Sequence, residues 1–237
     1  MKESLIWKIK HLHGFKYQNY AADFFETKFF VSDEFIESLF AFQLAPSQLF
    51  VILEGIYNLN TEEEIKLCIN SKFNCAQIST ITDVWHFSGV HVNDLKPYAR
   101  EDISADIMCD IPHFIKAGLT KEQINLCINE TNSDKRRLIF GKLVEGHTTS
   151  QVKVYSKSGL STEQSCQLAM LFDMGLSVEE VSIYVNDGYS FEKLCEIVAG
   201  YKAGLTSEDV SKYANPKLKV KQMRRIRESL VLKKADV

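Results

Sequence analysis

The sequence predicts an all-α protein, an α-solenoid of about six to seven two-helix repeats of 28–31 residues with a cap at each end. Three observations carry this prediction. A glycine recurs roughly every 29 residues, a helix-capping pattern follows it, and apolar residues with helical spacing precede it. Self-similarity at a fixed period of this length is the mark of a repeat architecture. By analogy with other helical arrays, we expect a right-handed superhelix.

The recurring glycines mark where the first helix of each repeat ends. They are Gly89, Gly118, Gly146, Gly175 and Gly204. Glycine adopts the left-handed conformation that terminates many helices at little cost. One step upstream the series reaches Asn58, and asparagine is the next-best residue for this conformation. We therefore expect a left-handed helix end at Asn58 as well.

A second, shorter helix is predicted after each of these positions. Thr61, Thr120 and Ser177 are followed three residues later by Glu or Gln, which is a capping box, and Thr206 is followed by Asp209, a shorter variant. The next position is apolar in every repeat and is expected in the core: Ile65, Leu95, Ile124, Val152, Val181 and Val210. A helix of about nine residues does not persist alone in water, so neighbouring repeats must hold it.

The first helix, of about 14 residues, is predicted from apolar residues ten, seven and three positions before the glycine. Met108, Ile111 and Ile115 show this spacing, as do Leu194, Ile197 and Tyr201. Pro46 is expected to start such a helix and Pro216 to lie in a loop. Pro97 and Pro112 fall inside predicted helices, so we expect the repeats to be irregular across 95–115.

Three segments follow from this pattern. Residues 1–30 are rich in aromatic residues and are expected to form an N-terminal cap. Residues 31–218 form the helical repeat array. Residues 219–237 form a basic C-terminal capping helix, in which Met223, Ile226 and Leu230 share one apolar face.

Composition narrows the class of protein. Of 237 residues, 45% are hydrophobic and 25% are charged, which is typical of soluble globular proteins. No apolar run is long enough for a transmembrane helix, and the N-terminus lacks the apolar core of a secretory signal. The six cysteines form no CxxC pair, and Cys68 matches Cys127 while Cys166 matches Cys195 in repeat position. We expect core cysteines, a reducing cytoplasm and no membrane association.

No catalytic, cofactor or metal motif is expected. The chain contains no HExxH, GxSxG, P-loop or GxGxxG sequence. His86 and His91 have a spacing that permits metal ligation, but repeat position explains both. His91 stands at a helix cap, and His86 stands at the core position three residues before the glycine.

Charge is distributed unevenly along the chain. From Lys212 to Lys234 there are nine Lys and Arg residues and one acid, which gives +8, so the remainder of this −3 chain carries −11. Candidate partner- or phosphate-contacting residues are Lys217, Lys219, Lys221, Arg224, Arg225 and Arg227, with a smaller basic spot at Lys135 and Arg136. Three interpretations remain open: a solvated cap helix, a docking face for an acidic protein, or a phosphate-contacting face for RNA or DNA.

The C-terminal motif resembles a known repeat family. Tyr213-Ala-Asn-Pro-Lys-Leu218 and then Gln222-Met-Arg-Arg-Ile-Arg-Glu-Ser-Leu230 resemble a helical repeat of Firmicutes proteins, often carried by plasmids, phages and other mobile elements. In that family the pattern is Tyr-Ala-x-Pro-x-Phe, then Gln-Met-x-x-Ile-Arg-x-Gly-Leu, so Leu218 and Ser229 depart from it. The resemblance implies a helical array of mobile-element origin without a catalytic motif.

A second resemblance is looser. The Gly-Leu-Ser/Thr-x-Glu-Glu step is similar to repeats of mitochondrial transcription terminators and, more distantly, to TAL-effector-like repeats, which bind nucleic acid. The leucine-rich first helix and recurrent proline of the terminator repeats are absent here.

These observations predict a non-enzymatic protein that binds another macromolecule, with another protein as the expected partner. The first resemblance adds the hypothesis of a phage or mobile-element factor that engages or inhibits a host or defence component. One alternative is a nucleic-acid-binding array that uses the basic C-terminal helix. A further alternative is an enzyme with an unrecognised site.

Overall fold

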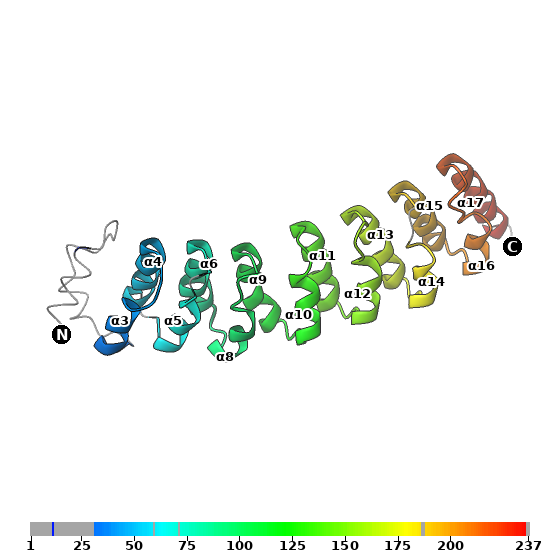
Figure 1. Cartoon of the computed structure of the whole chain (residues 1–237). Helices are drawn as coiled ribbons and strands as arrows, with labels where there is room; N and C mark the ends of the chain where they lie inside the picture. Colours follow the sequence, from blue (N-terminus) through cyan, green and yellow to red (C-terminus); the bar gives the residue numbers. More distant parts are fainter. Residues whose placement is uncertain (1–10, 12–30, 59, 71, 186–187, 236–237) are drawn as a thin grey trace. The chain divides into compact units, whose positions relative to one another are not determined.

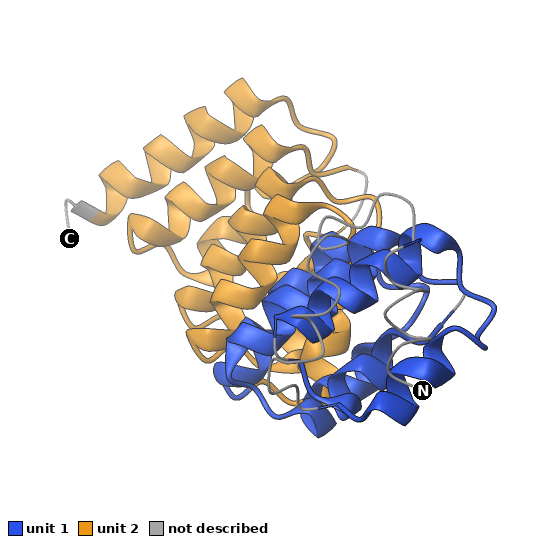
Figure 2. Cartoon of the chain, turned by 90° about the vertical axis from the view of Figure 1, so that its left-hand side faces the viewer, with its two compact units in different colours: residues 1–118 blue, residues 119–237 orange. Residues whose placement is uncertain are grey.

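The computed structural model describes residues 11, 31–58, 60–70, 72–185 and 188–235. Every regular element in these residues is helical and none is a strand, which confirms the all-α class (Figure 1). The chain divides into two compact units, residues 1–118 and 119–237 (Figure 2). The cap predicted for residues 1–30 lies outside the described residues.

Unit 1 alternates longer and shorter helical segments. The longer segments are α4 (Pro46–Tyr57), the continuous run of α6 (Cys75–Ser79), η2 (Thr80–Trp85) and α7 (His86–Ser88), and α9 (Ala105–Lys116). The shorter ones are α3 (Asp33–Leu39), α5 (Glu62–Cys68), and α8 (Val92–Leu95) with the 3₁₀ turn η3 (Lys96–Tyr98). The middle segment packs against both α4 and α9, so the longer helices stack in chain order within this unit.

Unit 2 continues the alternation with greater regularity. The longer helices are α11 (Ser133–Val144), α13 (Thr162–Asp173), α15 (Phe191–Lys202) and α17 (Val220–Ala235), and each packs against the next. Their first residues are 29 positions apart. The shorter helices are α10 (Lys121–Ile128), α12 (Thr149–Tyr155), α14 (Val178–Ser182) and α16 (Ser207–Ser211). The capping helix predicted within 219–237 is thus present as α17.

The glycine and capping predictions are confirmed in detail. The five repeat glycines have φ between +71° and +102°. The capping boxes at Thr61, Thr120, Ser177 and Thr206 all form, including the one closed by Asp209. The six apolar residues expected in the core after these caps are at most 2% exposed.

Two details differ from the prediction. Asn58 is the C-cap of α4 and has φ −83°, whereas Gly118, Gly146, Gly175 and Gly204 lie one residue beyond the C-cap of their helices. Gly89 is the C-cap of α7 and is left-handed. The helices are also shorter than expected. The uninterrupted first helices before α17 have 12 residues, and α5, α8, α10, α12, α14 and α16 have four to eight.

The prolines explain an irregular region of unit 1. Pro97 lies in the 3₁₀ turn that follows α8, which has only four residues. Pro112 lies inside α9 and has no N–H for the carbonyl of Met108 four residues before it. The buried indole of Trp85 donates to that carbonyl instead, with Nε1 2.8 Å from the oxygen. A donor from the neighbouring helix therefore allows α9 to continue through its proline.

Among the described residues, no helix combines the length and apolar character needed to cross a membrane.

Two glycines inside first helices permit close packing. Gly55 in α4 and Gly200 in α15 occupy the same repeat position, and a Cβ added to either would overlap a neighbouring side chain. At Gly55 it would lie 2.5 Å from Cγ2 of Thr82, and at Gly200 it would lie 1.8 Å from the hydroxyl of Tyr213. Tyr213 is fully buried, so it has little room to move.

We expect Gly200→Ala to lower the free energy of unfolding by about 1–3 kcal/mol, because the added methyl group must displace Tyr213. The matched control is Gly141→Ala in α11, where an added Cβ meets nothing within 4 Å. This change should raise stability by up to about 1 kcal/mol through helix propensity. Urea unfolding of both variants checks the prediction, which equal effects of the two substitutions would contradict.

Candidate binding surfaces

The first candidate surface is a groove in unit 1, formed along its shorter helices. It consists of two adjoining depressions of about 500 and 360 Å³ that share Lys66, Leu67 and Lys96. The segment after α3 contributes Phe42 to the larger depression, and α8 contributes Val92 to the smaller one. The groove therefore follows α3, α5 and α8, the second helices of successive repeats.

The groove combines apolar and basic side chains. Phe42 is 46% exposed, and Leu44, Leu67, Ile69 and Val92 are half-buried. Lys96 is exposed and contacts no carboxylate in the described part of the chain. The ammonium of Lys66 lies 3.4 Å from Glu62 and 5.4 Å from the ring centre of Phe35. The groove thus offers apolar contacts beside two exposed ammonium groups.

The second candidate surface is the basic C-terminal segment, part of which serves to hold α17 in place. Glu196 on α15 is only 4% exposed, and its carboxylate accepts hydrogen bonds from two arginines of α17. The Nε atoms of Arg224 and Arg227 lie 2.7 and 2.9 Å from its two oxygens. Arg224 and Arg227, both candidates from the sequence, therefore have an intramolecular partner.

Other candidates in this segment are free at the surface. Lys217, Lys219, Lys221 and Arg225 are exposed, and none of their side chains pairs with a carboxylate among the residues described. We call these four residues the α17 surface. Lys221 and Arg225 are four residues apart in α17 and therefore share one helix face, while Met223 is fully buried.

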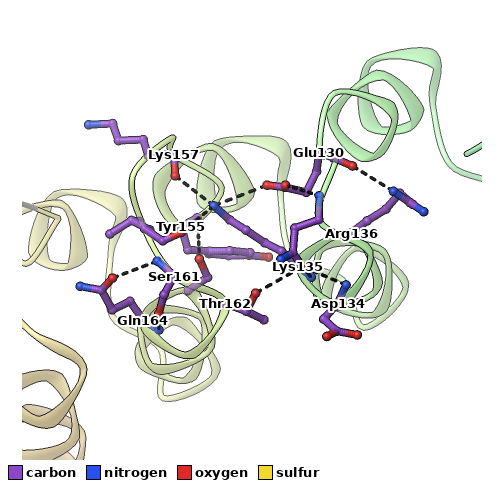
Figure 3. A network of polar contacts seen from close by, with 12 residues as sticks. Glu130, Asp134, Lys135, Arg136, Tyr155, Lys157, Ser161, Thr162 and Gln164 are labelled. Carbon is purple, nitrogen blue, oxygen red and sulfur yellow. Dashed lines mark hydrogen bonds and ion pairs between the residues drawn. The ribbon is translucent and has the colours of Figure 1, made fainter. Parts of the chain in front are cut away.

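The basic spot expected at Lys135 and Arg136 is not a surface feature. Their exposures are 5% and 3%. The Lys135 ammonium donates to the carbonyls of Lys157 and Leu160, at 3.0 and 3.2 Å, and lies 3.5 Å from Glu130 (Figure 3). Arg136 donates to the Glu130 carbonyl at 3.1 Å. Both side chains turn inward because backbone carbonyls of the adjoining loops need donors.

Lys135 belongs to a series of contacts that the sequence analysis missed. In α4, α6, α11, α13 and α15, the third residue donates to a backbone carbonyl near the start of the next first helix, whereas α9 has Ile107 at this position. Gln48 reaches the carbonyl of Phe73, Gln77 that of Ile103, Gln164 that of Tyr189, and Lys193 that of Pro216. The detectable signal was a long polar donor two residues after the helix start, recurring at the repeat period.

His147 forms the centre of a polar cluster in unit 2. It stands after Gly146, where the other repeat glycines are followed by leucine or, at Val90, by valine, and is 8% exposed. Its Nε2 lies 2.8 Å from Asp173 and its Nδ1 lies 3.2 Å from the hydroxyl of Tyr155. Lys142 also bonds Asp173, at 2.8 Å. Because both ring nitrogens have partners within the protein, the cluster ties α11, α12 and α13 together and leaves neither nitrogen free for a substrate.

The cysteines at matching repeat positions and two of the histidines, His86 and His91, have structural positions. Cys68 and Cys127 are fully buried, as expected, and Cys166 and Cys195 are half-buried. The Nδ1 atom of His91 caps α8 by accepting from the backbone N–H of Asn93. His86 lies half-buried, 3.0 Å from Glu64. Within the described ranges, no group of three His, Cys, Asp or Glu residues has a metal-binding arrangement.

No protein-family model matches the chain, and comparison with curated proteins and with solved structures gives no match either. The resemblance to mobile-element repeats therefore rests on the sequence pattern alone.

We expect Lys135→Met to lower the free energy of unfolding by about 1–3 kcal/mol, because two loop carbonyls lose their donor. Lys135→Gln introduces the residue that α4, α6 and α13 carry at this position and should cost less. Urea unfolding of the two variants gives the comparison. A glutamine variant less stable than the methionine variant would contradict a donor role.

Asp173 should contribute stability that depends on pH. Burial favours its neutral form, but hydrogen bonds from Lys142 and His147 outweigh burial and hold the pKa of Asp173 below its ordinary value. A lowered pKa stabilises the fold above the unfolded-state value of about 3.9. This stabilisation is lost as the pH falls through the folded-state value.

We therefore expect wild type to be more stable than Asp173→Asn at neutral pH, with a difference that shrinks below about pH 4. Unfolding titrations at several pH values measure this difference. Glu179→Gln, which changes an exposed carboxylate without a described partner, is the control and should leave stability nearly constant. A difference between wild type and Asp173→Asn that does not vary with pH would exclude the contribution.

Proposed function

We propose that this chain is a non-enzymatic binding protein whose partner is another protein, docked in the groove of unit 1. The observation that carries the proposal is the joint presence there of the exposed Phe42, half-buried apolar side chains and two exposed ammonium groups. Protein interfaces combine an apolar centre with a polar rim, and aromatic residues are enriched in them. The groove offers Phe42 and Leu67 for the first role and Lys66 and Lys96 for the second.

The chemistry of the groove defines the partner segment. Glu63 is the single acid among the groove-lining residues, all of which are described, so the groove is basic although the chain is net acidic. A fitting segment carries apolar side chains for the floor and carboxylates for the two lysines. An amphipathic acidic helix meets both needs, since residues three and four apart lie on one face.

The repeat resemblance extends this proposal to the source of the partner. If the chain derives from a mobile element, the segment belongs to a host or defence component that the protein engages or inhibits. Inhibition requires only that binding cover a functional surface of the partner, so the proposal needs no catalytic residue in this chain.

A displayed library of helical peptides tests the groove directly. We expect selection on the full chain to enrich peptides with acidic residues spaced along an apolar face. The double variant Lys66→Glu/Lys96→Glu should bind the enriched peptides at least about tenfold more weakly, a loss of about 1.4 kcal/mol. Fluorescence anisotropy with labelled copies of those peptides gives the affinities.

The charge-matched control is Lys116→Glu/Lys121→Glu, which changes two exposed lysines outside the groove and should retain binding. Circular dichroism and thermal unfolding confirm that both double variants are folded. Selection that yields no acidic apolar motif, or equal weakening by the two double variants, would overturn the proposal.

A further inference from the structure

The structure separates the basic residues of the C-terminal segment into two sets. In the first set, Arg224 and Arg227 bond Glu196, Lys212 pairs with Asp209 at 2.9 Å, and Lys234 donates to the carbonyl of Gly204. These side chains secure the end of unit 2. The second set includes the α17 surface, whose four residues are exposed and contact no carboxylate in the described chain.

Helix stability does not explain the lysines of the α17 surface. The second residue of α11, α13 and α15 is acidic in each case (Asp134, Glu163 and Glu192), and this charge suits the positive end of a helix dipole. In α17 the same position is Lys221, and Lys219 stands where the earlier helices have an Asn or Ser cap. Because these cations oppose the dipole, the cap alone gives no reason for them.

The α17 surface has few apolar side chains near it, and the large exposed one in α17, Leu232, lies seven residues after Arg225. Between residues 217 and 225, Leu218 and Val220 are half-buried and Met223 is buried, so no large apolar side chain is exposed there. Lysine is depleted in the cores of protein interfaces, whereas phosphate contacts need charge and no apolar area. This composition contrasts with the groove of unit 1 and favours a phosphate ligand over an acidic protein.

From these observations we infer that the α17 surface binds the phosphate backbone of a nucleic acid, as a site separate from the groove. Lys217, Lys219, Lys221 and Arg225 supply the contacts, and these are independent of base sequence. The acidic remainder of the chain, at −11, repels phosphates and confines contact to this end. The contact is therefore short, with about four phosphates neutralised.

The number of neutralised phosphates determines how strongly duplex binding should depend on salt. Each neutralised phosphate of a duplex contributes about −0.9 to the slope of log K against log salt, so four contacts give a slope of about −3.6. Changing Lys217, Lys219 and Lys221 together to Gln leaves Arg225 and should reduce the slope to about −1. Fluorescence anisotropy with a labelled DNA duplex, between about 50 and about 200 mM salt, measures both slopes.

The variants must leave the fold intact. Arg224 and Arg227 are unsuitable because their loss leaves the Glu196 carboxylate buried and unpaired, which destabilises the end of unit 2. The charge-matched control instead changes Lys121, Lys157 and Lys202 to Gln, three exposed lysines of the same unit. Thermal unfolding should give nearly the same midpoint for both triple variants and wild type.

We expect the control to keep the wild-type slope and the α17-surface variant to lose most of it. Absence of duplex binding at about 50 mM salt, or equal loss in both triple variants, would overturn the inference. Polyglutamate that binds the α17 surface more tightly than the duplex does at the same salt would overturn it in favour of an acidic protein. The groove variant Lys66→Glu/Lys96→Glu should leave duplex binding unchanged. The proposal for the groove and the inference for the α17 surface can therefore be contradicted independently.

Discussion

Hydrogen bonds from one first helix to the start of the next are the contacts on which the stacking of each unit depends. The second helices are as short as four residues, so they contribute little order of their own. A long side chain at the third position of a first helix donates to a carbonyl of the following loop, as Gln164 does to Tyr189. Such a bond fixes the loop and aligns the next helix, because a buried carbonyl left without a donor is costly.

The same helix position accepts different donors according to its surroundings. Glutamine serves in α4, α6 and α13, whereas lysine serves in α11 and α15. A lysine at this third position has a structural role, although its charge suggests contact with another molecule. Lys135 is an example, because its ammonium donates hydrogen bonds to two backbone carbonyls and lies beside Glu130. Charge in this chain therefore has to be interpreted together with repeat position.

The proposed binding surfaces lie where repeat positions depart from the pattern that stability requires. Lys219 and Lys221 replace a polar cap and an acid at the start of α17, against the helix dipole. Phe42, which lines the groove of unit 1, is 46% exposed. His147 departs too, but its ring is bonded on both nitrogens and serves packing. A residue that departs from the repeat pattern therefore indicates a binding function only when its side chain stays exposed to a partner.

The sequence by itself determined the helical class, the repeat period, the left-handed glycines and the capping boxes, because these depend on residues close together in the chain. It did not reveal the Trp85 bond that supports α9 through Pro112, or the inward turn of Lys135. It also grouped Arg224 and Arg227 with the lysines of the α17 surface. Only the tertiary structure separated them, because the deciding partners, Met108, Leu160 and Glu196, lie 23 to 31 residues away and no local pattern specifies such pairings.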